Sequence, residues 1–429
     1  MATTRDSSGA LTLGGISLAE LSRDPAIGTP TYVYDIDAIV AEAAELSLAF
    51  DGAPHLVAYA VKANSAGPIV RALGEAGCGA DVVSGAELLV ALGCGIAPEK
   101  VVFSGVAKSD GELTRAIACG ERGIGAIQLE SIEEIARAEA RARALGRRAR
   151  VSVRVNPAVT LDALDTHAHI ATGHDEAKFG VPRDDVPRAL EMIRASSSLE
   201  LVGVTVHVGS QFVSTAAYVE AAAVCFEIAR VVREQSGAKS LAFIDAGGGF
   251  GIDYGDGCAV RPADFVRAAR AEQRKARLDD LALYVEPGRS LVAAHGVLLA
   301  NVIQPKVART RRWLLIDAGM NDLLRPALYQ ARHRIVVLEE TANAATASWN
   351  VVGPVCESSD DFGVHVLPSA PPTAVAILDA GAYGFTMASR YNGRQLPVEA
   401  FVQGGRVIAS TARLAPEEWA ASRLTISRR

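Results

Sequence analysis

The sequence has few cysteines, few aromatic residues and no long apolar run. Its six cysteines in 429 residues include no CxxC spacing and fall well below the density of disulfide scaffolds. No apolar stretch reaches the roughly 18 residues that cross a bilayer. The first fifteen residues have no apolar core before a cleavage site, so we expect no secretory signal. Together these absences predict a soluble, cytoplasmic protein with reduced thiols.

An excess of basic residues is absent as well. The 49 acidic residues outnumber the 43 basic ones, giving a net charge of -6, and the basic residues are spread along the chain. This distribution argues against nucleic acid as a partner. Apolar residues make up 49% and charged residues 21%, which excludes a disordered or fibrous chain. The length suits two domains, or one barrel with an appendage.

From about residue 55, short β-rich apolar runs alternate with turn residues and amphipathic helices. In one helix, an apolar stripe recurs at i, i+3, i+4 and i+7, formed by Val186, Ala189, Leu190 and Ile193. Eight strand-helix units predict a closed, parallel (β/α)8 barrel of the TIM type. An open doubly wound sheet would also alternate, but its glycine fingerprint follows the first strand, whereas here the glycines follow the seventh. The eight predicted strands are 55–61, 80–83, 101–104, 125–129, 150–155, 201–207, 241–245 and 281–286.

After Arg289 the pattern changes to short β-branched runs separated by turn residues. This pattern predicts an all-β domain after the barrel. The early run Thr31–Asp35 is also strand-like and could join that later sheet. We therefore expect the barrel to occupy residues 36–290 and a discontinuous β-domain to comprise residues 1–35 and 291–429.

Active sites of such barrels lie at the carboxyl ends of the strands, so polar residues there are candidates for chemistry. Lys62 follows the first strand and is one of only seven lysines against 36 arginines. At a strand end it could be an ordinary solvated residue of the rim. If it is buried at the barrel mouth, its amine loses protonation and becomes a nucleophile able to form a Schiff base.

The sixth and seventh strands end in further candidates. His207 could be a satisfied core histidine, or its ring could lie flat against a planar ligand, while Ser210 could donate to an oxyanion. Three consecutive glycines, Gly247, Gly248 and Gly249, could form a plain tight turn or direct their N–H groups at a phosphate. No Lys-Ser/Thr pair follows them, so they do not form a Walker A loop.

The eighth strand ends with Glu286 and Arg289 around a Pro-Gly turn. The two could form a structural salt bridge. Alternatively, the carboxylate could face a ring nitrogen and the guanidinium a phosphate or substrate. Four strand ends thus offer an amine, a ring-stacking group, a phosphate cradle and an acid, which is the set that pyridoxal phosphate requires.

At these residues the sequence resembles the fold-type III pyridoxal-phosphate-dependent decarboxylases over nearly its whole length. The wider group shares AYAVKANS, GADVVSGAEL, HVGSQ, GGGFGI, EPGRS and GAYG. Other stretches resemble the diaminopimelate branch of the family specifically. They are THAHIATGHDEAKFG, DAGMNDLLRPALY, VVGPVCESSD and MASRYNGR.

The resemblance implies a role for each matching residue. Lys62 would carry the coenzyme, His207 would stack on its ring and Glu286 would face the pyridine nitrogen. Further coenzyme contacts would come from Asp81, Ser210, Gly247, Gly248, Gly249, Gly288, Arg289 and Tyr383. The resemblance also places Arg289 and Tyr383 near the substrate, whose distal end would be held by Arg325, Tyr329 and Glu357.

The family also implies a homodimer with shared active sites. Cys356 and Glu357 would reach into the partner's site, and Cys356 would be the proton donor. On its own, Cys356 would be interpreted as an ordinary buried thiol. The discontinuous β-domain would then contribute to both the active site and the dimer interface.

The implied activity is pyridoxal-phosphate-dependent decarboxylation of meso-2,6-diaminopimelate to L-lysine and carbon dioxide, in lysine biosynthesis. A decarboxylase of another basic, acidic or carrier-bound amino acid is an alternative, because barrel and coenzyme site would be unchanged. A non-catalytic coenzyme-binding protein is an alternative from another class. The long stretch between the fifth strand and its helix contains Asp165, His167, His169 and His174. We interpret it as a loop that closes over the substrate rather than a metal site, and we expect no metal.

Overall fold

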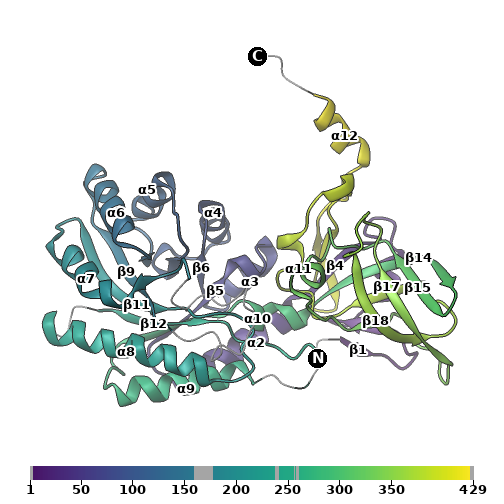
Figure 1. Ribbon diagram of the computed structural model, residues 1–429, viewed down its shortest axis with the longest axis horizontal. Helices are drawn as coiled ribbons and strands as arrows, with labels where there is room; N and C mark the ends of the chain where they lie inside the picture. Colours follow the sequence, from purple (N-terminus) through teal and green to yellow (C-terminus); the bar gives the residue numbers. More distant parts are fainter. Residues whose placement is uncertain (1–2, 159–176, 237–240, 256, 258–259, 426–429) are drawn as a thin grey trace. The chain divides into compact units, whose positions relative to one another are not determined.

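The computed structural model describes residues 3–158, 177–236, 241–255, 257 and 260–425. The chain divides into two compact units (Figure 1). One comprises Val40–Asp253 and Cys258–Ser290, and the other Met1–Ile39, Tyr254–Gly257 and Leu291–Arg429. We call them the barrel unit and the β-rich unit.

The barrel unit contains eight parallel strands that close on themselves, within the part of the chain that the structure describes. Each strand pairs with the next along the chain, and the last returns to the first, as predicted for a (β/α)8 barrel. The short strand β10 (Val181–Pro182) adds to β9 outside this ring. The eight strands are β5 (His55–Ala60), β6 (Gly79–Val82), β7 (Val101–Phe103), β8 (Ala126–Leu129), β9 (Ala149–Asn156), β11 (Leu199–Val206), β12 (Phe243–Gly248) and β13 (Ala282–Glu286).

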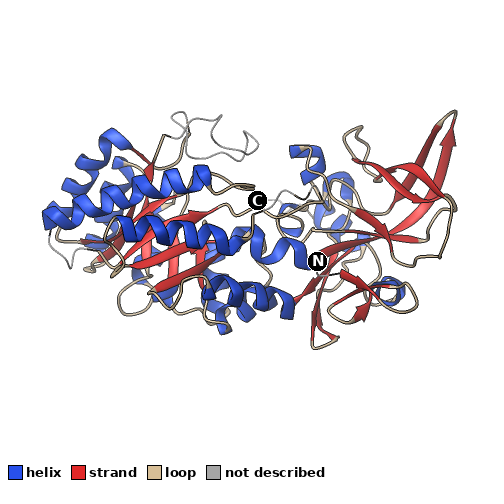
Figure 2. Ribbon diagram, turned by 90° about the horizontal axis from the view of Figure 1, so that it is seen from below, coloured by secondary structure: helices blue, strands red, loops and turns tan. Residues whose placement is uncertain are grey.

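Helices connect these strands and cover them, as Figure 2 shows. Three of them begin after a serine N-cap. Ser84, Ser109 and Ser131 each accept the backbone N–H three residues further on, and Ser109 forms a capping box with Glu112. The predicted apolar stripe of residues 186–193 is the buried face of its helix. The helices are α2 (Ile36–Leu48), α3 (Gly67–Glu75), α4 (Gly85–Gly93), α5 (Asp110–Ala118), α6 (Ile132–Ala144), α7 (Val186–Ala195), α8 (Ala216–Ser236), α9 (Pro262–Lys275) and α10 (Arg289–Val292).

The barrel interior has an apolar layer and a polar layer. The apolar layer draws buried side chains from strands all around the ring, so it fills the inside: Leu56, Ala58, Val102, Ala126, Val202 and Phe243. Since side chains alternate along a strand, the residue two positions on points inward as well. Two positions after Val102, Ala126 and Phe243 come Ser104, Gln128 and Asp245, all buried. The polar layer therefore lies toward the carboxyl ends of the strands.

The β-rich unit is built around one long strand, β14, which pairs with β4, β15 and β19. The early run Thr31–Asp35 forms β4 and does join the later sheet, pairing antiparallel with β14 and parallel with β20. The sheet follows the order β18-β17-β15-β14-β4-β20-β21, with β16 on β19. Its strands are β4 (Thr31–Asp35), β14 (Gly296–Ala308), β15 (Arg311–Ile316), β16 (Ile335–Val337), β17 (Thr346–Val352), β18 (Asp361–Pro368), β19 (Ala374–Ile377), β20 (Val398–Gln403) and β21 (Arg406–Ser410).

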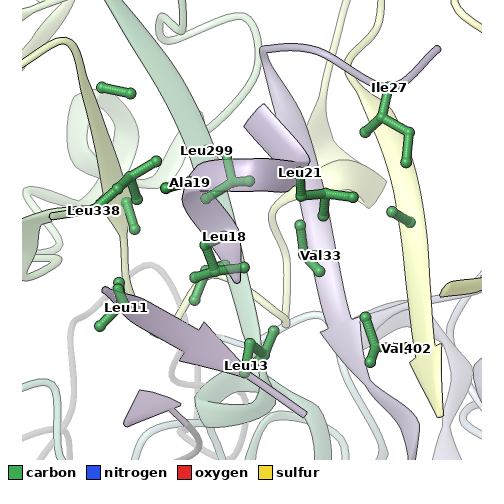
Figure 3. Packing of buried hydrophobic residues seen from close by; sticks show 14 of the residues in the cluster. Leu11, Leu13, Leu18, Ala19, Leu21, Ile27, Val33, Leu299, Leu338 and Val402 are labelled. Carbon is green, nitrogen blue, oxygen red and sulfur yellow. The ribbon is translucent and has the colours of Figure 1, made fainter. Parts of the chain in front are cut away.

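The core of this unit joins both ends of its chain (Figure 3). Leu18 and Leu21 of helix α1 (Leu18–Arg23) pack with Val33 of β4, Leu299 of β14 and Val402 of β20. A small sheet of β1 (Thr3–Arg5), β2 (Leu11–Leu13) and β3 (Ile16–Ser17) precedes α1. Two short helices, α11 (Arg325–Tyr329) and α12 (Pro416–Leu424), complete the unit. No helix among the described residues is long and apolar enough to span a membrane.

The apolar layer of the barrel predicts one large effect on stability. Phe243 is 1% exposed, and its ring lies 4.1 Å from that of Tyr284, nearly parallel to it. We expect Phe243→Ala to lower the free energy of unfolding by about 3–5 kcal/mol, because it leaves a cavity inside a closed ring of strands. Urea unfolding monitored by circular dichroism measures this. Leu48→Ala, on a side chain that is 77% exposed, is the control, and an equal loss in both variants would contradict the assignment.

Candidate active site

Lys62 lies directly after β5, in the short turn Val61–Ala63. Its Nζ donates to Asp81 Oδ2 at 2.8 Å, and Asp81 is fully buried on the neighbouring strand β6. The lysine side chain itself is 31% exposed. The amine is therefore held at the mouth of the barrel, with its head group fixed by a buried carboxylate and part of its surface open.

The polar layer continues from Asp81 as one hydrogen-bonded group. Ser104 donates to Asp81 and lies 2.9 Å from Gln128 Oε1. The Gln128 amide nitrogen donates to Glu286 Oε1 at 2.8 Å and to Asp245 Oδ2 at 3.0 Å. Lys62 and Glu286 are thus connected through the buried side chains of Asp81, Ser104 and Gln128.

The three carboxylates of this layer differ in their affinity for protons. Burial, followed by the charge of Glu286, raises the pKa of Asp81 and raises that of Asp245 well above its usual range. Burial also opposes ionisation of Glu286, but its contact with His207, the charge of Lys62 and a hydrogen bond with Asp245 lower its pKa to about 2. Glu286 is therefore the permanently charged member of the group.

His207, just after β11, lies against this layer. Its Nδ1 is 3.4 Å from Glu286 Oε2 and accepts the Gly248 N–H at 3.2 Å, so two contacts fix the plane of the ring. Burial lowers the pKa of His207, and the imidazole is neutral at pH 7. Because Nδ1 accepts the Gly248 N–H, the neutral ring cannot also donate to Glu286 from that nitrogen, and the lowered pKa of Glu286 then rests on the charge of Lys62 and on Asp245.

The glycine turn after β12 admits no side chain. Gly247 and Gly249 have φ values of 72° and 89°, in the left-handed region that favours glycine. A Cβ on Gly248 would collide with the carbonyl oxygen of Glu286, and one on Gly249 with that of Gly209. The backbone of this turn is therefore close-packed, and the N–H groups of Gly247 and Gly248 donate to Asp245 Oδ1 and His207 Nδ1.

Ser210 and Arg289 come together at the same mouth. The Arg289 guanidinium donates to Ser210 Oγ at 2.9 Å, and Arg289 is 6% exposed. Gly288 beside it fits against the turn that carries Lys62, since a Cβ there would lie 3.0 Å from that of Ala63. A hydroxyl and a guanidinium side by side form a suitable donor set for a phosphate.

A second buried charged group adjoins the polar layer, and sequence reasoning missed it. Arg154 on β9 pairs with Glu130 at 2.9 Å and donates to the backbone oxygen of His207 at 3.3 Å. Lys108, 2% exposed, pairs with Glu134 at 3.2 Å. Each of these buried charges therefore has an opposite charge beside it, and Arg154 links its pair to the backbone of His207.

The β-rich unit holds Arg325 at the start of α11. Its Nη1 lies 2.8 Å from His333 Nε2, and His333 Nδ1 lies 2.9 Å from the carbonyl oxygen of Leu378. Its guanidinium also lies over the ring of Tyr254, 4.8 Å from the centroid. Arg325 and His333 are both buried. Tyr329, half-buried, ends the same helix.

Cys356 and Glu357 lie exposed on a loop that contacts two motifs distant in sequence. Asn392 accepts the N–H of Cys356 at 2.8 Å, and Tyr391 donates its hydroxyl to Glu357 Oε1 at 2.5 Å. Buried Asp360 accepts the N–H groups of Met320 and Val355, both at 2.6 Å. The motifs containing DAGMND, VCESSD and RYNGR are thus neighbours in space, and together they present the thiol and the carboxylate.

Tyr383 lies after β19 with a φ of 55°, a left-handed conformation that is rare outside glycine. Such strain is typical of functional sites. The backbone around it is tightly packed, because a Cβ on Gly381 would collide with the carbonyl oxygen of Val292. The backbone at Tyr383 is therefore held in one conformation by its close packing.

The structure brings the predicted residues together in two sets, one in each unit. The barrel set was found from strand ends, but its linking members Ser104, Gln128 and Asp245 were missed, because their partners lie on other strands, far away in the sequence. In the β-rich unit, His333 and Asn392 were missed, since only the folded chain reveals their partners. The loop histidines His167, His169 and His174 and Asp165 lie outside the described residues. No metal-binding cluster occurs among the residues that the structure describes.

Comparison with known sequences agrees with this geometry. The family model for the pyridoxal-binding domain of pyridoxal-dependent decarboxylases matches residues 36–293. The diaminopimelate decarboxylase of Zymomonas mobilis is 40% identical over 403 residues, covering 93% of each chain. That of Pseudomonas aeruginosa is 39% identical over 391 residues, covering 91% of each.

Solved structures agree as well. Diaminopimelate decarboxylase from Helicobacter pylori, complexed with L-lysine, superposes with a TM-score of 0.86 at 37% identity, covering 94% of this chain and 98% of that one. The enzyme from M. jannaschii, in complex with L-lysine, gives a TM-score of 0.91 at 32% identity, with 99% and 98% coverage. A lysine/ornithine decarboxylase from Vibrio vulnificus, 21% identical, shares the fold. The chain therefore belongs to the pyridoxal-dependent decarboxylase family and, within it, to the diaminopimelate decarboxylases.

Proposed function

We propose that this chain is a pyridoxal-phosphate-dependent decarboxylase that converts meso-2,6-diaminopimelate to L-lysine and carbon dioxide, a step of lysine biosynthesis. The observation that carries the proposal is the 40% identity to a diaminopimelate decarboxylase over 93% of both chains. The polar residues at the barrel mouth supply the matching chemistry. The runner-up, a decarboxylase of another amino acid, differs only in the groups that select the substrate.

The residues present fit the coenzyme. The glycine turn at 247–249 carries no side chain, since a Cβ on any of the three would collide with a backbone oxygen, and Ser210 with Arg289 adds two groups suited to a phosphate. Lys62 offers the amine through which this family holds its coenzyme. When bound, pyridoxal phosphate supplies an electron sink for the electron pair that departing carbon dioxide leaves behind.

The side chains around Lys62 govern its proton. An amine must be neutral to act as a nucleophile, and Asp81 lies 2.8 Å from Lys62 Nζ. Burial and then the charge of Glu286 raise the pKa of Asp81, which makes its carboxylate a better base than an exposed one. Asp81 is thus placed to hold the proton that Lys62 releases and to return it.

Glu286 and His207 set the environment of the coenzyme ring in this proposal. Glu286, whose pKa is lowered to about 2, stays charged and favours a protonated pyridine nitrogen. His207, kept neutral by the burial that lowers its pKa, offers its flat face without adding a competing charge. The two residues are 3.4 Å apart, so they act as one rigid surface.

The β-rich unit supplies the groups that we propose for the substrate. Arg325 would bind the distal carboxylate and Glu357 the distal amine, with Tyr329 and Tyr383 as further contacts. Cys356 would donate the proton that replaces the lost carboxylate. We propose a homodimer in which Cys356 and Glu357 serve the partner's site, and a cytoplasmic location, where a catalytic thiol stays reduced.

Purified protein with added coenzyme should release carbon dioxide and L-lysine from meso-2,6-diaminopimelate. Ornithine, lysine, arginine and glutamate should react at least about tenfold more slowly, because none offers both a distal carboxylate and a distal amine to Arg325 and Glu357. Steady-state assays with product analysis measure this. A preference for another amino acid would favour the runner-up, and no release from any would favour a non-catalytic binding protein.

Lys62→Ala should abolish the visible absorbance band of the bound coenzyme together with activity, because the covalent attachment is lost. Absorption spectra recorded after dialysis measure this. Lys100→Ala, at a lysine that donates only to a backbone carbonyl at 3.1 Å, is the matched control and should keep the band. An undiminished band in Lys62→Ala would show that a different lysine holds the coenzyme.

Mixing Lys62→Ala with Cys356→Ala protein should restore roughly a quarter of wild-type activity. Half of randomly mixed dimers are hybrids, and each hybrid has one site with an intact lysine and an intact cysteine. The measurement is activity after dissociation and reassociation, with each variant remixed alone as the control. Recovery no greater than in the controls would argue against shared sites.

A further inference from the structure

The polar layer of the barrel contains three buried carboxylates linked through Ser104 and Gln128, which is unusual for groups that repel when charged. Asp81 and Asp245 are fully buried, and Glu286 is 3% exposed. Asp81 has the ammonium of Lys62 at 2.8 Å. Glu286 lies 3.4 Å from His207 and within reach of the charge of Lys62. Asp245 instead contacts neutral donors, the Gly247 N–H at 2.9 Å and the Gln128 amide at 3.0 Å.

Asp245 and Glu286 are neighbours, because the Gln128 amide nitrogen donates to one oxygen of each, at 3.0 and 2.8 Å. Two ionised carboxylates have only acceptor atoms, so a bond between them requires a proton on one of the two. Keeping both charged at this depth would cost far more than binding that proton. The burial of both groups around one shared amide therefore favours one carboxylic acid in the pair.

We propose that Asp245 is that acid: a positioning residue that stays protonated at neutral pH and donates its hydrogen bond to the carboxylate of Glu286. The assignment to Asp245 follows from the surroundings. Burial and the charge of Glu286 raise the pKa of Asp245 well above its usual range, while the neighbours of Glu286 lower its pKa to about 2. Gln128, which donates to both carboxylates, holds the pair in register.

The protonated Asp245 gives Glu286 a fixed orientation without adding charge. Glu286 Oε1 accepts from Gln128, and the Asp245 proton adds a second donor, so the carboxylate is held from the floor of the barrel. An ionised Asp245 would repel Glu286 and raise the pKa of that carboxylate. The proposal rests on the proposed function only in what Glu286 faces, because the proton on Asp245 is a property of the protein alone.

Other titrating groups near Asp245 have to be separated from it. Glu286 and Asp81 belong to the polar layer. From α8, Cys225 lies 3.7 Å from the Asp245 carbonyl oxygen, and burial raises the pKa values of Cys225 and Tyr218. Burial likewise raises the pKa of Tyr284 on β13. Both tyrosines and the thiol therefore remain neutral around pH 7. Burial raises the pKa values of Asp322 and Glu399 in the β-rich unit to about 7, and subtracting the spectrum of the Asp245→Asn variant removes their bands.

Infrared difference spectroscopy tests the proton directly. At pH 7 the spectrum of wild type minus Asp245→Asn should contain the carbonyl stretch of a protonated carboxylic acid, in both apo and coenzyme-bound protein. Asp81→Asn is the matched control and should keep the band. A band that survives in Asp245→Asn and disappears in Asp81→Asn would overturn the proposal, as would its absence from wild type.

Labelling wild-type protein with carbon-13 aspartate keeps the test valid if a variant fails to fold. The label should shift the acid band, which assigns it to an aspartate. Labelled spectra are recorded at pH 9, where Asp322 and Glu399, whose pKa values burial raises to about 7, are ionised, and a labelled glutamate sample should leave the remaining band in place. A band that shifts only with labelled glutamate would place the proton on Glu286 and refute the assignment.

Activity measurements show whether Asp245 acts by positioning Glu286 or has to be charged. Asp245→Asn is neutral and can still donate, so we expect kcat within about threefold of wild type, whereas Asp245→Ala should lose about tenfold or more. Because the pKa of Asp245 is raised, the acid form persists below that value and is lost only above it. The ratio of wild-type to Asp245→Asn activity should thus stay constant over about pH 6 to 8.

A ratio that changes steadily with pH over that range, or an Asn variant as impaired as the Ala variant, would refute the proposal. Failure of the proposed function would look different. The protein would then release no lysine from meso-2,6-diaminopimelate, while the acid band of Asp245 would still be present in the apoprotein.

Discussion

Burial of several carboxylates in one layer is the constraint on which the barrel site depends. Inside a closed ring of strands each charge must find its partner among the protein's own side chains. Asp81 finds it in Lys62, and Glu286 finds it in Gln128, His207 and the charge of Lys62. The same contacts that make burial tolerable also fix the amine and the acid that coenzyme chemistry needs. The same contacts are therefore needed both for the stability of the barrel and for the chemistry of the site.

The layering of the barrel follows from the two-residue period of its strands. Val102, Ala126 and Phe243 fill the interior, and the residues two positions on form the floor of the site. A pattern of this kind places polar side chains at the carboxyl ends without any special local structure. It also explains why the order of apolar runs in the sequence was enough to predict a closed barrel, a class that the structure confirms.

Site residues at the ends of apolar runs could be predicted from the sequence, whereas site residues at regular positions inside a strand could not. Lys62, His207 and Glu286 follow or end apolar runs and stand next to glycine or proline, so the sequence marks them. Gln128 and Asp245 occupy ordinary inward positions of strands. Their importance depends on distant partners, because Gln128 contacts Asp245 and Glu286, which lie 117 and 158 residues away in sequence. Asn392 likewise acquires its meaning only when the fold brings it to Cys356. The periodicity of the sequence predicts strands and helices, but it does not predict which distant side chains come into contact.

The segment Tyr254–Gly257 gives the two units an unusual connection along the chain. It follows β12 of the barrel in sequence but clusters with the β-rich unit, where Tyr254 contacts Arg325 and His333. A Cβ on Gly255 would lie 2.8 Å from Arg334 Cδ, so Gly255 packs closely against that side chain. The polypeptide consequently passes from one unit to the other four times, at 39–40, 253–254, 257–258 and 290–291. Neither unit can be excised as one uninterrupted fragment, and a gene truncated to either would sever native packing.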